Sequence, residues 1–310
     1  MMYQAGLILE GGGMKGLYTA GVIDFFLDRG IEFSSVYGVS AGACSMCSYL
    51  SKQRGRARDV CIDYVGRWDY CSVASLLATG DLFNVELNYH LVPEHLNPYD
   101  YEAFRQYRGK AYSVATDIVS GRPEYFRIRD VKKDMTKIRA SASLPLVSRN
   151  VRVGRGLYLD GGLSDSIPVQ KSIIDGNPRN VVVMTKEVGF VRRRTKGYML
   201  RLAGLRYWRY PKVTELMMER NEHYNQQVAY VNRLQKSGQA FVIRPRGPVD
   251  VGRVEKNPRK LRALYDRGYA DARACCGELM EFLEKCEVCK DFLSGQEGHG
   301  HLFSTPAKKI

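Results

Sequence analysis

The first fifty residues alternate twice between a short apolar run and a helical segment, and this alternation constrains the fold more than any other feature. Residues 5–9 are an apolar run that ends in glycines, and apolar side chains then recur at helical spacing over residues 16–29. A second run over residues 31–39 leads through another glycine-flanked turn into a helical segment over residues 41–50. Strands that alternate with helices indicate a parallel sheet covered by helices on both faces. The sequence therefore predicts an α/β fold.

The rest of the chain divides into an insertion, further α/β elements and a C-terminal part. Residues 54–104 contain no clear strand, and we interpret them as a mainly helical insertion that shapes the binding site. The pattern then predicts strands over residues 111–116, 124–128, 157–159, 181–185 and 240–243, and helices over residues 133–142, 213–236 and 257–285. We assign residues 1–185 to a core domain, 186–295 to a basic and helical part that packs on it, and 296–310 to a flexible tail.

Charge is the unusual part of the composition. The 310 residues include 47 Lys and Arg against 33 Asp and Glu, which gives a net charge of +14. A chain with 45% hydrophobic and 26% charged residues is neither disordered nor fibrous. The charge excess favours an anionic partner, whether nucleic acid, phospholipid headgroups or an acidic substrate.

Much of the excess lies in residues 186–212, where aromatic side chains alternate with basic ones. The basic residues are Lys186, Arg192, Arg193, Arg194, Lys196, Arg201, Arg206, Arg209 and Lys212, and the aromatic ones are Phe190, Tyr198, Tyr207, Trp208 and Tyr210. Three interpretations remain: a solvated charged face, a surface for anionic lipid headgroups, or a nucleic-acid surface. Aromatic rings at headgroup depth suit the lipid surface, and no nucleic-acid motif accompanies them, so a nucleic-acid partner is disfavoured.

No targeting or membrane-spanning signal is found. Charged residues interrupt every apolar stretch before it reaches about 18 residues, which excludes a spanning helix. The N-terminus has neither a basic start nor a small-residue cleavage site, so it does not resemble a signal peptide. We therefore expect a cytoplasmic protein, with peripheral contact to a membrane.

The eight cysteines are dispersed, which is not typical of a disulfide framework, and we expect reduced thiols. Two C-x-x-C pairs, Cys44/Cys47 and Cys286/Cys289, raise the alternative of a zinc site with four thiolate ligands. The first pair lies among small side chains in a predicted helix, which favours packing over metal binding. We therefore expect no metal.

The pattern G-x-S-x-G, formed by Gly38, Ser40 and Gly42, stands between the second predicted strand and its helix. A nucleophile elbow needs this arrangement, because the serine occupies a strained turn and flanking glycines remove side chains that would collide there. The N-terminus of the following helix also directs backbone N–H groups toward charge that develops near the serine. Ser40 is therefore a candidate nucleophile.

A triple glycine, Gly11 to Gly13, follows the first predicted strand and continues through Lys15 and Gly16 into the first helix. Exposed N–H groups of consecutive glycines suit an oxyanion hole or a phosphate cradle. The same residues satisfy G-x-G-x-x-G, yet the second strand ends without the acidic residue that dinucleotide binding requires. A P-loop is excluded because Lys15 is followed by glycine. We therefore expect an oxyanion hole and no nucleotide cofactor.

A third motif, Asp160 with Gly161 and Gly162, closes an apolar strand 120 residues after Ser40. Aspartate followed by glycine is most often only a turn. A serine hydroxyl, however, is a weak nucleophile until a neighbouring group accepts its proton. Asp160 is therefore the candidate base.

Together these motifs resemble the patatin-like phospholipase family. The resemblance rests on residues 11–16, 38–42 and 160–162, and on the segment 141–145 (Ser-Ala-Ser-Leu-Pro) ahead of the aspartate, all in the family's order and approximate spacing. It covers roughly residues 5–185.

This resemblance implies a three-layer α/β/α fold with a mostly parallel sheet, in which residues 1–185 form the catalytic core. It further implies that Ser40 is the nucleophile, Asp160 the general base, and the amides of Gly11, Gly12 and Gly13 the oxyanion donors. Lys15, Gly16, Gly38, Gly42, Gly161 and Gly162 support these motifs. The implied activity is hydrolysis of acyl esters of phospholipids or lysophospholipids through a Ser-Asp dyad and an acyl-enzyme, without a cofactor.

The sequence also allows two alternatives to this dyad enzyme. An ordinary α/β-hydrolase would use a Ser40, Asp160 and His223 triad, but that fold places several strands before its elbow, whereas one strand and one helix precede residue 31 here. The other alternative is a catalytically silent scaffold that binds membrane or nucleic acid through residues 186–212. Turnover of an ester discriminates between the enzyme and the scaffold.

Overall fold

An eight-stranded mixed sheet runs through the centre of the molecule in the order β5-β6-β3-β2-β1-β7-β8, with β4 beside β3. The computed structural model describes residues 2–286, so the tail predicted over residues 296–310 and Cys289 lie outside the described residues. The strands are β1 (Met2–Leu9), β2 (Glu32–Val39), β3 (Lys110–Asp117), β4 (Pro123–Ile128), β5 (Val151–Val153), β6 (Gly156–Asp160), β7 (Asn180–Val183) and β8 (Ala240–Ile243). The five strands β3-β2-β1-β7-β8 are parallel, whereas β4, β5 and β6 pair antiparallel at one side.

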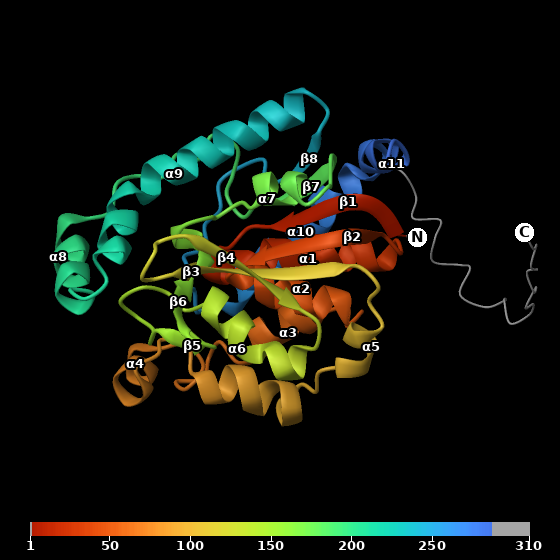
Figure 1. Cartoon of the computed structure of the whole chain (residues 1–310). Helices are drawn as coiled ribbons and strands as arrows, with labels where there is room; N and C mark the ends of the chain where they lie inside the picture. Colours follow the sequence, from red (N-terminus) through yellow and green to blue (C-terminus); the bar gives the residue numbers. More distant parts are fainter. Residues whose placement is uncertain (1, 287–310) are drawn as a thin grey trace, which may run out of the picture.

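Helices cover both faces of this sheet, with α1 and α2 on one face and α7 and α9 on the other (Figure 1). The helical elements are η1 (Gly13–Lys15), α1 (Gly16–Asp28), α2 (Ala41–Leu50), α3 (Arg56–Asp63), α4 (Val73–Thr79), the π-helical η2 (Leu87–Leu96), α5 (Tyr101–Arg105), α6 (Val131–Ser141), η3 (Gly161–Leu163), α7 (Val169–Ile174), α8 (Gly197–Arg206), α9 (Pro211–Lys236), α10 (Pro258–Ala274) and α11 (Cys276–Glu284). The predicted three-layer α/β/α class is therefore confirmed.

Residues 5–9 of strand β1 lack polar side chains because both faces of the strand are buried there. Leu7 and Leu9 contribute to the core beneath α1, α2 and α10, while Ile8 points to the second core beneath α7 and α9. Side chains alternate between the faces of a strand, so a strand covered on both sides lacks the polar alternation of a surface strand. This explains the continuous apolar runs of the sequence.

The C-terminal helices are tied to the first helix by buried polar contacts. Across α1 and α10, Tyr18 donates a hydrogen bond to Asp271 at 2.9 Å and Tyr265 donates one to Asp24 at 2.7 Å. Hydrogen bonds to charged acceptors are stronger than neutral ones, and these two link residues that are more than 240 positions apart. The C-terminal part thus packs directly on the core.

Element boundaries agree best where local signals are strong. The predicted helix over residues 41–50 and the predicted strand over residues 240–243 coincide with α2 and β8. The predicted helix over residues 257–285 is two helices, because the chain turns at Cys275 between α10 and α11. Strand β5 and helices α7 and α8 were not predicted.

Candidate active site

Ser40 occupies the sharp turn between β2 and α2. Its backbone φ of 55° and ψ of −123° are strained for a residue with a side chain. A Cβ atom added at Gly42 would come within 2.2 Å of the carbonyl oxygen of Leu9, and one at Gly38 within 2.5 Å of the Cα of Ala43. The glycines of the motif are therefore required by close packing, and the turn has the conformation of a nucleophile elbow.

Sheet register brings Asp160 to the same place. On β3, Val114 pairs with Val39, the last residue of β2, and the next residue, Ala115, pairs with Asp160 at the end of β6. Strand β4 pairs with this whole stretch of β3, so β2 and β6 must share the opposite edge. The ends of β2 and β6 consequently meet at this edge. Ser40 directly follows β2 and Asp160 ends β6, so the two residues line the same pocket.

The last residue of α6 and the segment that follows it hold both residues. The N–H of Ser40 donates to the hydroxyl oxygen of Ser141 at 2.9 Å, and the N–H of Asp160 donates to the carbonyl oxygen of Ser143 at 2.7 Å. From the sequence, residues 141–145 are predicted only as a motif shared with the family. Their structural role is to connect the serine turn with the aspartate.

The Asp160 carboxylate is almost completely buried, with 1% of the residue exposed. Its Oδ1 atom accepts a hydrogen bond from the N–H of Gly162 at 2.7 Å, which explains the glycine turn after the aspartate. Its Oδ2 atom is buried and has no hydrogen-bond partner within residues 2–286. Ser40 is therefore not hydrogen bonded to Oδ2 in this structure, and one oxygen of the carboxylate remains able to accept a proton.

The triple glycine lies beside the serine turn. Within the described part of the chain, the N–H groups of Gly11 and Gly12 donate no hydrogen bond, and Gly13 begins η1, where an N–H has no helical partner. Gly13 has a φ of +59°, and a Cβ atom there would lie 2.6 Å from the carbonyl oxygen of Arg253. The loop that carries Arg253 thus packs against the glycines, and the amides of Gly11 and Gly12 are free to donate hydrogen bonds.

One small pocket is lined by Ser40, Asp160, Gly162 and all three glycines. The structure therefore brings together in one pocket the residues that the sequence predicted as nucleophile, base and oxyanion donors, and their roles stay predictions. Of the supporting residues, Gly16 packs against Ala41, and a Cβ at Gly161 would lie 2.1 Å from the carbonyl oxygen of Val114. Lys15 ends η1 and does not line this pocket.

Four basic side chains that sequence analysis did not assign to the site line the same pocket: Lys186, Arg192, Arg220 and Arg253. Burial lowers the pKa of Lys186 to about 8. Nearby cations lower it further, whereas the Glu10 carboxylate acts in the opposite direction. Burial and the adjacent Arg253 and Arg192 guanidinium groups lower the pKa of Arg220 to about 9. Two of these residues belong to the basic segment, so the interpretation of residues 186–212 as one external face is wrong at Lys186 and Arg192.

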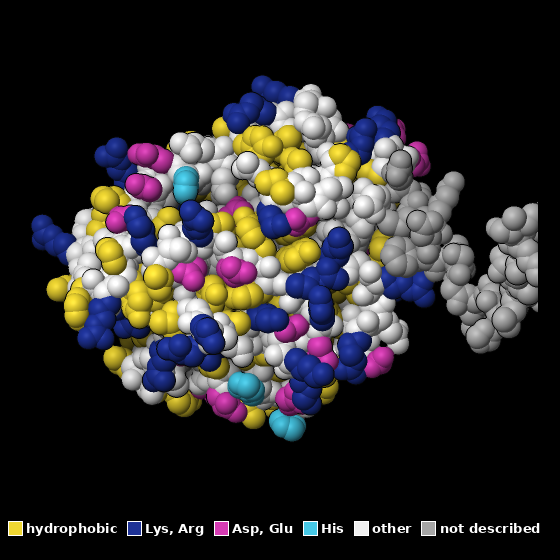
Figure 2. All heavy atoms as spheres, viewed as in Figure 1, with side chains coloured by type: hydrophobic (Ala, Val, Ile, Leu, Met, Phe, Trp, Pro, Cys, Tyr) yellow, Lys and Arg dark blue, Asp and Glu magenta, His cyan; other side chains and the backbone are white. Residues whose placement is uncertain are grey.

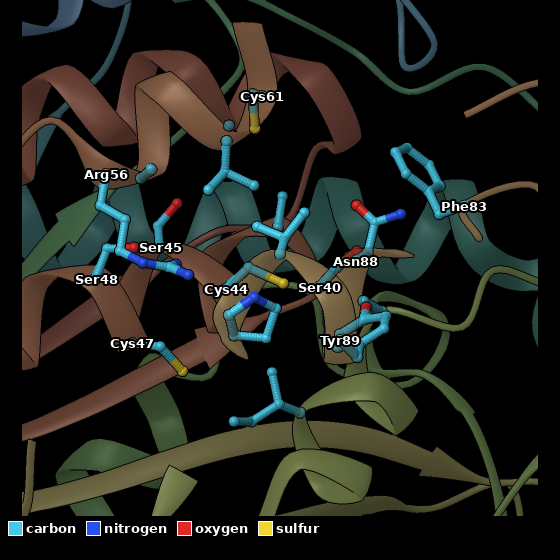
Figure 3. Close-up of a pocket in the computed structure, with 18 of the residues that line it drawn as sticks. Ser40, Cys44, Ser45, Cys47, Ser48, Arg56, Cys61, Phe83, Asn88 and Tyr89 are labelled. Carbon is cyan, nitrogen blue, oxygen red and sulfur yellow. The ribbon is translucent and has the colours of Figure 1, made fainter. Parts of the chain in front are cut away.

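A second, apolar cavity of about 170 Å³ adjoins the first, and Ser40 and Leu144 line both. Side chains of α2 and of the insertion converge on it, including Cys44, Cys61 and Tyr89 (Figure 3). Helices α3 and η2 therefore supply walls of this cavity. The Cys44 side chain is exposed to this cavity, and desolvation by the surrounding protein raises the pKa of its thiol to about 12.

The histidine and the cysteines that the sequence also offered as candidates do not contribute to the pocket of Ser40 and Asp160 in the described residues. His223 is exposed on α9 and does not line the pocket of Ser40 and Asp160. The seven cysteines among residues 2–286 are free thiols, and no cluster suited to a metal ion occurs in that range. In the same range, no helix combines the length and apolarity that crossing a bilayer requires.

The fold and pocket define an α/β protein in which a strained serine turn, a buried aspartate and a glycine-rich loop line one pocket. The model of the patatin-like phospholipase family matches residues 7–172, which is more than half of the chain, and the chain belongs to this family. This membership supports lipid ester hydrolysis as the class of activity. A second model, a domain of unknown function designated DUF6363, matches residues 210–284.

Among curated proteins, the chain is similar to the uncharacterized protein YjjU of Escherichia coli, with 31% identity over 183 residues. The match covers 58% of this chain and 51% of YjjU, so it spans about half the length of that relative. Among solved structures, VipD from Legionella pneumophila has 14% identity and a TM-score of 0.42, over 91% of this chain and 67% of VipD. The type III effector ExoU has 14% identity and a TM-score of 0.37, over 92% of this chain and 54% of ExoU.

Proposed function

We propose that the chain is a serine hydrolase that cleaves acyl esters of phospholipids or lysophospholipids with Ser40 as nucleophile and Asp160 as general base. One observation carries the proposal. The unpartnered Oδ2 atom of Asp160 is buried in the pocket that Ser40 lines, while Oδ1 is held by Gly162. A carboxylate with one anchored and one free oxygen is suited to receive the serine proton.

The reaction has two steps. The Ser40 hydroxyl oxygen attacks the ester carbonyl while Asp160 takes its proton, and the tetrahedral oxyanion is stabilised by the free amides of the triple glycine. Asp160 then returns the proton to the leaving alcohol, and the C–O bond breaks to leave an acyl-Ser40 ester. In the second step Asp160 removes a proton from water as the water oxygen attacks the acyl carbonyl. Asp160 then returns that proton to the Ser40 oxygen as the C–O bond breaks, which releases the fatty acid and restores the serine hydroxyl.

The apolar cavity is the proposed acyl-chain site. Ser40 stands at its boundary with the polar pocket, so a carbonyl at the serine would place an acyl chain on one side and the glycerol part on the other. Apolar pockets with a few converging polar groups are typical of ligand sites. The insertion over residues 54–104 would then determine the chain length that is accepted.

Peripheral contact with an anionic membrane is part of the same proposal. Helix α8 and the residues just after it carry exposed apolar side chains: Tyr198, Leu202, Leu205 and Trp208. Basic side chains lie next to apolar ones around α8, at one end of the molecule (Figure 2). Such a combination suits an interface with anionic lipid. The prediction that Tyr207 contributes to this surface is wrong. Tyr207 is buried, and its hydroxyl oxygen accepts a hydrogen bond from the N–H of Leu146.

A covalent probe tests the hydrolase directly. A fluorophosphonate should lose fluoride and attach to Ser40, and peptide mass spectrometry should locate the adduct there. The same preparation should hydrolyse a short-chain chromogenic ester. A folded chain that neither reacts with the probe nor turns over the ester would instead favour the silent membrane- or nucleic-acid-binding scaffold.

A further inference from the structure

The pocket that contains Ser40 and Asp160 holds more positive than negative charge. Four basic side chains line it, against the two acidic side chains Glu10 and Asp160, which leaves a formal excess of two positive charges. We call Lys186, Arg192, Arg220 and Arg253 the cationic compartment. Ester hydrolysis by a serine and an aspartate does not by itself require such a set, so the compartment needs its own explanation.

Carboxylates of the protein neutralise only part of this compartment. Glu10 lies 3.6 Å from the Lys186 amine, and it also accepts hydrogen bonds from the backbone of Thr185 and the Tyr224 hydroxyl. Within residues 2–286, Arg192, Arg220 and Arg253 form no ion pair with a carboxylate. The three guanidinium groups are thus available to an external anion.

Two of the arginines, Arg192 and Arg220, are held against the pocket by contacts with neutral groups, whereas Arg253 lines the pocket from an exposed position on its loop. The Nε atom of Arg220 donates to the carbonyl oxygen of Gly162 at 3.0 Å. The Arg192 guanidinium lies 4.4 Å from the centre of the Tyr224 ring, and its Nε atom is buried without a partner in the described residues. Buried cations without anionic partners are unfavourable, and an anion that binds among them offsets this cost.

The compartment is assembled from residues outside the glycine, serine and aspartate motifs of the core. Lys186 and Arg192 follow β7, Arg220 lies on α9, and Arg253 lies on the loop before α10. Arg220 and Arg253 both fall within residues 210–284, the match to the domain of unknown function. In this chain, that part contributes two cations to the pocket of the nucleophile.

We propose that the cationic compartment binds a phosphate monoester, and that the preferred substrates are acyl glycerol phosphates whose phosphate lies within a few bonds of the scissile ester. A phosphate monoester carries about −1.5 to −2 charges near pH 7, which matches the excess of two positive charges. Arginine binds phosphate with two parallel hydrogen bonds. A phosphocholine headgroup would instead bring its own cation toward the arginines. This inference rests on the proposed hydrolase and specifies its substrate.

Three substrates with the same acyl chain test the proposal, each below its critical micelle concentration. They are an acyl glycerol 3-phosphate, an acyl glycerophosphocholine and a neutral monoacylglycerol. We expect kcat/KM to be at least tenfold higher for the phosphate monoester than for the neutral ester. In Arg192→Gln and Arg253→Gln this ratio should fall at least tenfold. Arg259→Gln, which removes an exposed arginine on α10, should keep the wild-type ratio.

A binding measurement separates this proposal from the hydrolase itself. Glycerol 3-phosphate should bind Ser40→Ala in calorimetry, and the binding should weaken at least tenfold when Arg192→Gln or Arg253→Gln is added. If Ser40→Ala binds glycerol 3-phosphate but the wild type hydrolyses none of the three esters, the hydrolase is overturned and the anion site is retained. Hydrolysis with equal kcat/KM for all three esters would overturn the anion site and retain the hydrolase. If inorganic phosphate binds as tightly as glycerol 3-phosphate while the ester preference is absent, the compartment binds a free effector and the headgroup proposal is wrong.

Discussion

The hydroxyl oxygen of Ser141 accepts a hydrogen bond of 2.9 Å from the backbone N–H of Ser40, which lies 101 positions earlier in the chain. The bond joins the end of α6 to the strained turn that presents the proposed nucleophile. Both groups are buried, so no solvent molecule replaces the acceptor easily. Ser141 is therefore a positioning residue for the turn.

We predict that Ser141→Ala destabilises the protein and slows ester turnover. The substitution leaves a buried N–H without an acceptor, which costs about 1–3 kcal/mol of the free energy of unfolding. Chemical denaturation measures the stability, and kcat for a soluble ester should fall while KM changes little. Ser237→Ala, at an exposed position after α9, is the control for a simple loss of a hydroxyl. Unchanged stability and kcat would show that the bond does not support the turn.

The dyad predicts a large loss of activity for each of its members. Ser40→Ala and Asp160→Asn should each lower ester turnover by about a thousandfold or more, because residues that act as a unit cannot replace one another. His223→Ala is the matched control, since this histidine is exposed on α9, and its rate should stay close to that of the wild type. Circular dichroism checks that each variant is folded. A collapse of activity in His223→Ala would restore the triad.

We expect Gly12→Ala to impair transition-state stabilisation. Its added Cβ atom would lie 2.7 Å from the Thr185 hydroxyl, so the loop must shift and misplace a free amide. Loss of one oxyanion donor costs about 3 kcal/mol, which corresponds to roughly a hundredfold lower kcat. The far-ultraviolet spectrum should remain near that of the wild type. Micromolar affinity for NAD or ATP in calorimetry would contradict the assignment of this loop to an oxyanion hole.

The lowered pKa of Lys186 predicts a stability change in alkaline solution. Because its pKa is about 8 in the folded protein and higher in the unfolded chain, the unfolded state binds more protons between these values. The free energy of unfolding should therefore rise with pH above about 8, relative to Lys186→Met, which cannot titrate. Denaturation from pH 7 to 10 measures the difference between the two curves. Parallel curves would mean that Lys186 stays charged throughout.

Membrane contact predicts a salt-dependent effect of the exposed basic residues. Replacing Arg193, Arg194 and Arg201 with Gln should weaken binding to anionic vesicles, at about 1 kcal/mol for each residue near the surface. Arg192 is left intact because it lines the pocket. Added salt should weaken wild-type binding, since screening limits the range over which exposed charges interact to about 8 Å at physiological ionic strength. Activity on vesicles should fall much more than activity on a soluble ester.

Equal co-sedimentation of the wild type and this triple variant with anionic vesicles at low salt would contradict membrane contact through these residues. Neutral vesicles provide the matched control, because they should bind both proteins equally weakly. The exposed apolar residues offer an independent variant. Leu205→Ser, at a residue that is 77% exposed on α8, should also weaken vesicle binding without altering the fold.

The sequence by itself predicted the features that depend on short stretches of chain. The apolar runs, the glycine turns and the helix over residues 41–50 are determined by local backbone conformation and by side-chain spacing. The serine turn belongs to this group, because a strained turn with no room for flanking side chains needs glycine at fixed positions. The combination of the three motifs and their resemblance to the family, rather than these local rules, predicted which residues would meet in the site.

Tertiary structure decided how those residues meet and what surrounds them. Asp160 lies beside Ser40 because β6 pairs antiparallel with the end of β3, a register between strands that are 40 residues apart. The cationic compartment combines residues from three separate segments, and Lys186 and Arg192 are turned inward from a stretch whose composition suggested a surface. Composition records the charge of a segment, whereas burial depends on long-range packing that no short stretch of sequence specifies.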